Sequence, residues 1–162
     1  MTHRPLQGII VDMFKWLDIP PMWLLACAVL AWLQAQYVTM GLSFGPGWAV
    51  PVGTGLVGLG LILVALALIE FTRRRTTPVP HMEASHLITT GVFAYSRNPI
   101  YLADVIILTG LILRWDAVLA VPLIPALAWI ITHRFILPEE ARLERGFGDA
   151  FLRYRGATRR WL

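Results

Sequence analysis

Long apolar runs separated by short polar segments dominate the chain. Four runs stand out, at about 22–39, 48–71, 99–113 and 117–137. At a rise of about 1.5 Å per residue the first run is just long enough to cross a bilayer, and the third is short. The pattern predicts an all-α integral membrane protein with about four transmembrane helices.

The segment before the first run has a different pattern. Between residues 6 and 17, apolar side chains recur at helical spacing on one face and polar side chains take the other. This predicts an N-terminal amphipathic helix in the membrane interface, ended by Pro20 and Pro21. No cleavable signal peptide is expected, because the stretch lacks a long apolar core and a small-residue cleavage site.

These patterns divide the chain into three parts. We expect the interfacial helix at 1–21, a first transmembrane hairpin at 22–71, and a catalytic region at 72–162. The last part contains the second hairpin and a cytoplasmic C-terminal helix that begins at Pro138.

Composition and charge agree with this class. Hydrophobic residues make up 57% of the 162 residues and charged residues only 15%, whereas soluble domains have about a quarter charged. The net charge of +4 comes from arginines, with four in segment 72–98 and six in the tail, against Arg114 alone in the opposite loops. The positive-inside rule therefore places segment 72–98 and both termini in the cytoplasm. We expect no nucleic-acid partner and no metal, since the single cysteine, Cys27, lies in an apolar run.

A glycine-rich hexapeptide, Gly53 to Gly58, matches the dinucleotide fingerprint G-x-G-x-x-G letter for letter. That fingerprint requires a preceding strand and a following helix, but here the residues lie inside an apolar run. Small residues in a membrane helix let a neighbouring helix approach closely. We interpret the hexapeptide as a packing surface and not as a nucleotide site.

Polar and aromatic residues gather in two segments on the expected cytoplasmic side, and the first is 86–101. Arg97 offers a fixed positive charge with a planar fork of donors. Asn98 followed by Pro99 predicts the N-cap and first residue of the third span, whose positive dipole end can hold a carboxylate or phosphate. The same residues also suit a plain capped membrane helix with an interfacial aromatic belt.

The second segment, 138–161, opens with Glu139 and Glu140. Two acids beside an anionic membrane surface are not explained by membrane insertion, so they are candidates to bind an amine or another cation. They also suit the first turn of a tail helix, where the helix dipole favours acids.

Asp104 lies about one turn inside the third span, where an ionisable side chain is costly and indicates a functional site. Its expected partners are Arg97 or Arg134, either in a structural ion pair or around a substrate. His133 and Arg134 also suit simple snorkelling to the membrane surface.

The two segments together resemble the signatures of the isoprenylcysteine carboxyl methyltransferase family. The first signature is GVFAYSRNPIY, from Gly91 to Tyr101. The second has the acid pair followed by Leu143, Phe147, Gly148, Tyr154 and a terminal arginine. These enzymes and the related phospholipid methyltransferases are integral membrane proteins that use S-adenosylmethionine. The resemblance covers about residues 80 to 162.

This resemblance implies an S-adenosylmethionine site at the cytoplasmic face. Glu139 is expected to hold the cofactor's ammonium, Arg97 its carboxylate, and rings such as Phe93 its adenine. The expected catalytic residues are Arg97, Glu140, Asp104 and Arg134, with Glu140 or Asp104 taking a proton from an amine acceptor. The expected cofactor-binding residues are His86, Leu87, Ile88, Gly91, Phe93, Tyr95, Arg97, Asn98, Pro99, Tyr101, Glu139 and Tyr154.

The methyl acceptor is expected to be a lipophilic small molecule or lipid with a carboxylate, amine or thiol. Phe135 stands where the prenylcysteine enzymes have an arginine, which argues against a prenylcysteine substrate. An apolar acceptor dissolves in the bilayer, so we expect it to enter through a lateral opening near Asp104, Arg134 and the fourth span. Membrane lipid is the second expected partner.

Two other classes compete with this hypothesis. The same segments resemble the C-terminal part of membrane sterol reductases, which use NADPH, are longer and tend to have an aspartate at Asp104. The second competing class is a non-enzymatic membrane scaffold whose arginines bind anionic headgroups. The acid pair and the short chain favour the methyltransferase.

Overall fold

The computed structural model describes residues 18–73 and 87–162, and the regular structure in these ranges is entirely helical. Residues 1–17 of the predicted interfacial helix, and His86, lie outside the described residues. The elements in chain order are α2 (Pro20–Tyr37), α3 (Pro46–Arg73), η1 (Gly91–Ala94), α4 (Pro99–Arg114), η2 (Val118–Ala120), α5 (Leu123–Ile131), η3 (Thr132–Ile136), α6 (Leu137–Phe147) and α7 (Asp149–Ala157).

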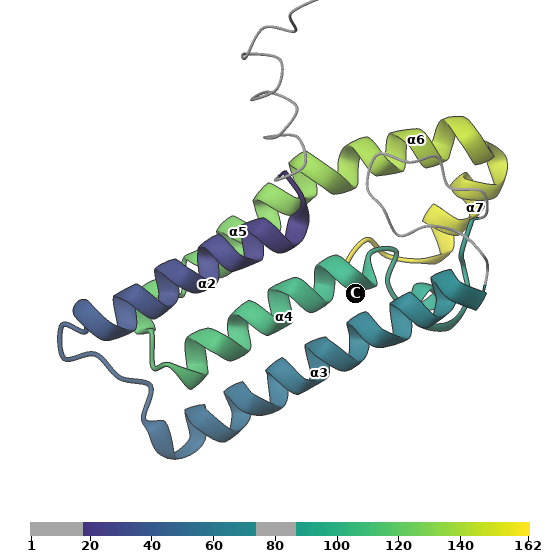
Figure 1. The fold of residues 1–162 in the computed structure, drawn as a ribbon. Coiled ribbons are helices and arrows are strands. Elements are labelled where there is room, and N and C mark those ends of the chain that lie inside the picture. The colour runs from purple at the N-terminus through teal and green to yellow at the C-terminus, as the bar shows by residue number, and fades with distance from the viewer. Residues whose placement is uncertain (1–17, 74–86) are drawn as a thin grey trace, which may run out of the picture.

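The four long helical segments form a bundle in which α4 lies between α3 on one side and α2 and α5 on the other (Figure 1). The α2–α3 loop and the α4–α5 turn are at one end. The start of α4, α6, α7 and the C-terminus gather at the opposite end (Figure 1). Each predicted apolar run therefore forms helix, and the all-α class is confirmed.

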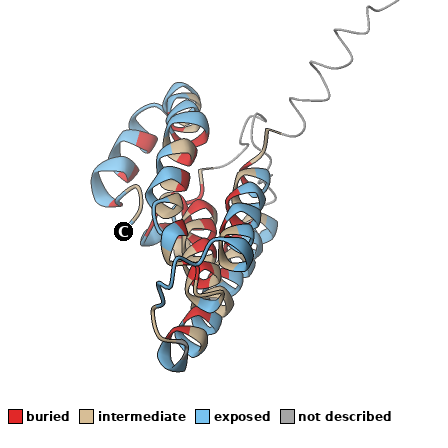
Figure 2. Cartoon of the chain, turned by 90° about the vertical axis from the view of Figure 1, so that its left-hand side faces the viewer, coloured by how far each residue is buried: buried red, intermediate tan, exposed pale blue. Residues whose placement is uncertain are grey.

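Two helices in the described ranges are long and apolar enough to cross a membrane, Gly47–Arg73 and Val118–Phe147. By comparison, α2 has 18 residues and α4 has 16, near or below the roughly 20 that a span needs. Buried residues face the inside of the bundle, whereas the outer faces are exposed (Figure 2). The outer faces of α2 and α3 carry large apolar side chains, among them Leu25, Leu30, Leu61 and Ile62. Such exposed apolar surface is typical of contact with lipid.

Close backbone contact joins α3 to α4. A Cβ atom at Gly53 would lie 2.5 Å from the carbonyl oxygen of Gly110, and one at Gly110 would lie 2.6 Å from that of Gly53. No side chain fits at either position, whereas Gly55 and Gly58 meet nothing within 4 Å. The hexapeptide lies inside α3 with no strand before it, so it is not a dinucleotide fingerprint, and the packing interpretation is confirmed for Gly53 but not for Gly55 and Gly58.

The fourth predicted run departs from a straight helix in two places. The 3₁₀ turn η2 precedes α5, and Pro122 and Pro125 lie at the N-cap and in the first turn of α5. Prolines there remove no intrahelical hydrogen bond, so they start this helix and do not kink it. The irregularity lies instead in the π-helical turn η3, which joins α5 to α6. The tail is also interrupted, because Gly148 (φ +49°) separates α6 from α7.

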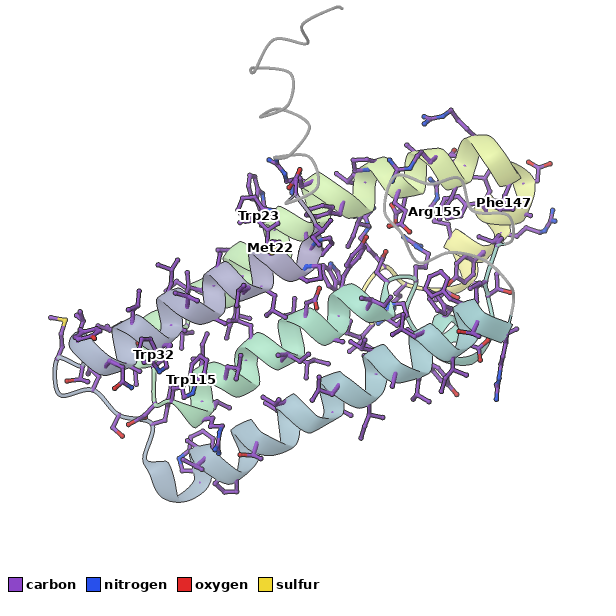
Figure 3. The ribbon with its side chains drawn as sticks, viewed as in Figure 1. Met22, Trp23, Trp32, Trp115, Phe147 and Arg155 are labelled. Carbon is purple, nitrogen blue, oxygen red and sulfur yellow. The ribbon has the colours of Figure 1, made fainter. Side chains whose placement is uncertain are left out.

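Asp116 joins the two connections at one end of the bundle, the α4–α5 turn and the α2–α3 loop. Its carboxylate accepts hydrogen bonds from the Ser43 hydroxyl at 2.5 Å and the Phe44 backbone N–H at 2.7 Å. Trp32 and Trp115 lie toward this end of the bundle, and Trp23 lies farther along it, near the start of α2 (Figure 3).

Candidate functional site

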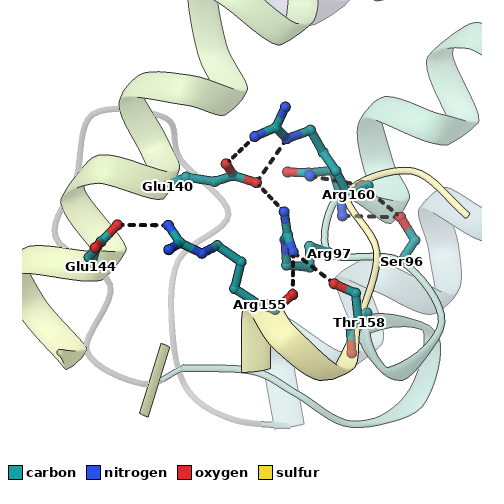
Figure 4. Close-up of polar contacts among 8 residues, drawn as sticks. Ser96, Arg97, Glu140, Glu144, Arg155, Thr158 and Arg160 are labelled. Carbon is teal, nitrogen blue, oxygen red and sulfur yellow. Dashed lines mark hydrogen bonds and ion pairs between the residues drawn. The ribbon is translucent and has the colours of Figure 1, made fainter. Parts of the chain in front are cut away.

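Three segments far apart in sequence meet at the other end of the bundle. They are the loop before α4, the first turn of α6, and the extension after α7 (Figure 4). This is where both sequence signatures fall, so the structure brings most of the predicted site residues to one end of the molecule.

The segment before α4 is anchored on the end of α3. Gly91 has φ +60°, and a Cβ there would lie 2.5 Å from the Glu70 carboxylate, so the tight turn requires glycine. The ring of Phe93 is buried and packs edge-on against Phe71, with ring centroids 5.4 Å apart. Ile88 is buried in the same cluster. Gly91, Phe93 and Ile88 thus form the base on which the following loop is held.

Asn98 occupies the N-cap position of α4 and Pro99 its first position, as the sequence predicts. The Asn98 side chain does not cap the helix. Its Nδ2 donates to the carbonyl oxygen of Arg160 at 3.0 Å, while its backbone N–H donates to Ser96 Oγ at 3.2 Å. Both Asn98 and Pro99 are buried, so the chain's own C-terminal extension covers the start of α4.

The Arg97 guanidinium, 9% exposed, is directed at the same extension and at α6. One terminal nitrogen donates to the backbone carbonyls of Arg155 at 2.9 Å and Thr158 at 2.7 Å. The other donates to Glu140 Oε1 at 2.8 Å (Figure 4). The Nε atom is buried and has no hydrogen-bond partner among the described residues.

Glu140 receives charge-assisted hydrogen bonds from two arginines. Besides Arg97, Arg160 donates from Nε to Oε1 at 3.1 Å and from a terminal nitrogen to Oε2 at 2.7 Å. The hydrogen bond to Glu140 raises the pKa of Arg160 above its ordinary value, so Arg160 stays charged at any accessible pH. We call Arg97, Glu140 and Arg160 the arginine–glutamate cluster. Because η3 leads directly into α6, the first turn of α6 is not a free helix end, which weakens the dipole explanation for these acids.

Glu139 faces a different partner from its neighbour. The buried Tyr101 hydroxyl donates to Glu139 Oε2 at 3.0 Å, so α4 and α6 are joined at this point. The Tyr101 ring packs against Phe135 of η3, with centroids 6.5 Å apart. Phe135 is itself a buried core residue, which explains why an apolar side chain stands at this position.

Asp104 is 5% exposed, and its Oδ2 has no hydrogen-bond partner in the described part of the chain. The expected partnership with Arg97 or Arg134 is wrong. Arg97 is engaged in the cluster above, and Arg134 donates from Nε to both Asp18 oxygens, at 2.8 and 2.9 Å. Arg134 also lies over the Trp23 ring, 5.5 Å from its centroid, on the outer, exposed side of η3. It therefore points away from the interior that contains Asp104.

The remaining predicted residues lie around this core. The Tyr154 hydroxyl donates to the Phe93 carbonyl at 2.6 Å, and burial raises the pKa of Tyr154 to about 12. Leu87 is half-buried, whereas Tyr95 is 79% exposed and lies at the surface.

Arg160, Ser96 and Thr158 have site contacts that the sequence analysis did not assign. The terminal arginine was part of the resemblance, but no local pattern connects it to Glu140, 20 residues earlier. Arg97 binds the backbone carbonyls of Arg155 and Thr158. Every residue has such a carbonyl, so the residue types at these positions do not indicate the contact.

Comparison with known proteins gives one finding. The family model described as phospholipid methyltransferase matches residues 48–150, from the start of α3 to the start of α7. No curated protein and no solved structure matches the chain.

Proposed function

The chain belongs to the phospholipid methyltransferase family, and from this premise we propose that it is an integral membrane methyltransferase that uses S-adenosylmethionine to methylate a lipophilic acceptor. One observation supports the proposal most. The two signature segments, about 40 residues apart, are joined by the Arg97–Glu140 and Tyr101–Glu139 bonds of 2.8 and 3.0 Å.

The residues at this end fit the polar groups of the cofactor at two points. Glu139 presents a carboxylate, held by Tyr101, that suits an ammonium group. Arg97 retains a buried Nε–H without a partner in the described residues, which suits a carboxylate. When bound, the cofactor supplies an electrophilic methyl group on a positively charged sulfur.

The protein's contribution is then position and a dry environment. Methyl transfer is an in-line displacement, so it depends mainly on alignment of the acceptor atom opposite the leaving sulfur. An amine or thiol acceptor must also lose a proton. Of the two candidate bases, Glu140 is bound by two arginines, whereas Asp104 has a buried oxygen with no described partner. Asp104 is therefore the better proton acceptor, at Oδ2.

We further propose that the acceptor enters from the bilayer, with both termini in the cytoplasm. Asp104 is the sixth residue of α4, a helix of 16 residues that is shorter than a full membrane span, so a headgroup can reach it from the nearby surface. Arg134, exposed on η3 and bound to Asp18, is placed to meet a substrate only on the outer side of the bundle.

Calorimetry with purified protein and either S-adenosylmethionine or NADPH tests the cofactor. We expect binding of S-adenosylmethionine, weakened by Glu139→Ala, with Glu144→Ala as the control on the exposed side of the same helix. Binding of NADPH alone would favour the reductase, and binding of neither would favour the scaffold.

Transfer of labelled methyl from S-adenosylmethionine into extracted lipids and into small hydrophobic amines, thiols and acids identifies the acceptor. Asp104→Asn should retain cofactor binding and lose turnover on amines and thiols. Full turnover in that variant contradicts the role of Asp104.

A further inference from the structure

We propose that Arg160 is a positioning residue of the cofactor site and that the C-terminal extension is part of that site. The inference rests on the proposed function, because the group it positions, Arg97, is the one proposed to bind the cofactor carboxylate. The family match ends at residue 150, so it does not include this extension.

The extension is fastened to the loop before α4 along its length. The Arg97 backbone N–H donates to the Arg159 carbonyl at 3.0 Å, and Asn98 Nδ2 donates to the Arg160 carbonyl at 3.0 Å. Arg97 reaches the Thr158 carbonyl at 2.7 Å. Residues 158–160 therefore lie directly against the residues that both the resemblance and the geometry assign to the site (Figure 4).

The Arg160 side chain determines how Glu140 binds Arg97. It occupies Glu140 Oε2 and shares Oε1, so Arg97 makes only one bond to this carboxylate. A carboxylate without Arg160 is free to bind Arg97 in the two-bond fork geometry that arginine favours. That change would rotate the guanidinium, break its bonds to the Arg155 and Thr158 carbonyls, and redirect Nε.

Arg160 also sets the charge of the cluster. Two arginines and one glutamate leave one surplus positive charge, next to a buried Nε–H with no described partner. This surplus favours an anionic group at Arg97. Removal of Arg160 leaves a neutral Arg97–Glu140 pair, with no net attraction for a carboxylate.

The test compares S-adenosylmethionine binding and turnover in Arg160→Ala, Arg160→Lys and Arg153→Ala. Arg153 is exposed on α7 and serves as the matched control, because its removal takes one positive charge from the tail without touching the cluster. We expect Arg160→Ala to raise the Kd and KM for S-adenosylmethionine about tenfold with kcat changed less than about twofold. Arg160→Lys, which keeps the positive charge but not the planar fork that reaches both carboxylate oxygens, should give about a threefold loss and provides the test if the alanine variant does not fold.

A double variant shows whether Arg160 acts through Glu140. In a Glu140→Gln background, Arg160→Ala should add clearly less than the loss of about tenfold expected with Glu140 present, because the carboxylate that Arg160 orients is gone and only the loss of its charge remains. Equal losses in Arg153→Ala and Arg160→Ala would overturn the inference, as would a loss of kcat with unchanged KM. If the unsubstituted protein binds S-adenosylmethionine, and Arg160→Ala and Arg160→Lys bind it equally well, the inference is overturned but the proposed function is not. An unsubstituted protein that binds no S-adenosylmethionine overturns the proposed function and this inference with it.

Discussion

The α3–α4 interface and the arginine–glutamate cluster hold their segments together by opposite physical means. At the interface, Gly53 and Gly110 let two backbones approach until no side chain fits between them. In the cluster, long charged side chains from three distant segments meet around one carboxylate. The interface depends on the absence of side chains and the cluster on their presence. A substitution should therefore damage the first by steric overlap and the second by leaving a buried charge without its partner.

The largest effect is expected from Arg97→Ala, because Arg97 makes three hydrogen bonds in the cluster and the largely buried Glu140 keeps only Arg160 as a partner. Breaking a buried ion pair costs about 3–5 kcal/mol when the remaining charge has no other partner, so with Arg160 still in place we expect a loss near the lower end of that range, about 3 kcal/mol in the free energy of unfolding. Chemical denaturation in detergent micelles measures it. Arg153→Ala is the charge-matched control and should change the free energy by less than about 0.5 kcal/mol. A loss below about 1 kcal/mol in Arg97→Ala would show that the cluster does not stabilise the fold.

The next effect tests the interface. Gly110→Ala places a methyl group 2.6 Å from the Gly53 carbonyl and 2.9 Å from the Val57 backbone nitrogen, so α3 and α4 must separate. We expect a destabilisation of about 1–3 kcal/mol in the same measurement.

Gly58→Ala is the control for that variant, since nothing lies within 4 Å of its Cβ position. Alanine favours helix over glycine, so this variant should be up to about 1 kcal/mol more stable. Opposite signs at Gly110 and Gly58 confirm the close approach, and equal signs contradict it.

A smaller, pH-dependent effect is expected at Tyr154, which fastens α7 to the loop carrying the cluster. Tyr154→Phe loses one buried hydrogen bond to the Phe93 carbonyl and should cost about 1 kcal/mol at pH 8. The pKa of Tyr154 is raised to about 12 in the folded protein, against about 10 when unfolded. The contribution of its protonated form is therefore present below pH 10 and lost as the pH rises toward 12.

That sign predicts a crossover. Above pH 10 the unfolded chain releases the Tyr154 proton first, so the unsubstituted protein loses about 1.4 kcal/mol per pH unit relative to Tyr154→Phe. When the free energy of unfolding is measured between pH 8 and 12, Tyr154→Phe should become more stable than the unsubstituted protein near pH 11. An equal pH dependence of the free energy of unfolding in the two proteins would mean that Tyr154 is not buried against the loop.

The smallest effect is expected at the surface pair of Glu144 and Arg155. Their contact distance of 3.0 Å is close to the 2.8 Å of Arg97 and Glu140, but each side chain is 45% exposed. Solvent screens such a pair, so Glu144→Ala should cost no more than about 0.5 kcal/mol. The contrast with Arg97→Ala then shows that contact distance alone does not determine how strongly such a pair stabilises the fold. A cost near that of Arg97→Ala would reject this explanation.

Local features of the chain were predictable. Asn98 and Pro99 start α4 as expected, and α3 covers the whole of the second predicted apolar run and extends two residues beyond it at each end. Other local signals have two meanings that the sequence alone does not separate. Pro122 and Pro125 suit either a kink or a helix start, and only the turn before α5 decides between them.

Side-chain partners were less predictable than helices. Glu139 and Glu140 are adjacent in sequence, yet one accepts from Tyr101 and the other from two arginines. The helical rotation of about 100° per residue points neighbouring side chains at different segments. Asp104 and Arg134 were expected to meet, but they lie on the inner and outer sides of the bundle.

The sequence by itself determined the helices, the membrane class and the end of the bundle that carries the polar chemistry. These follow from run length, proline and glycine positions and arginine distribution, which act over a few residues or one span. The tertiary structure alone decided the partners: Arg134 bonds to Asp18, 116 residues earlier, and Glu140 to Arg160, beyond the family match. Such contacts depend on how whole helices pack, and packing depends on shape at every interface together, so no short stretch of residues encodes them.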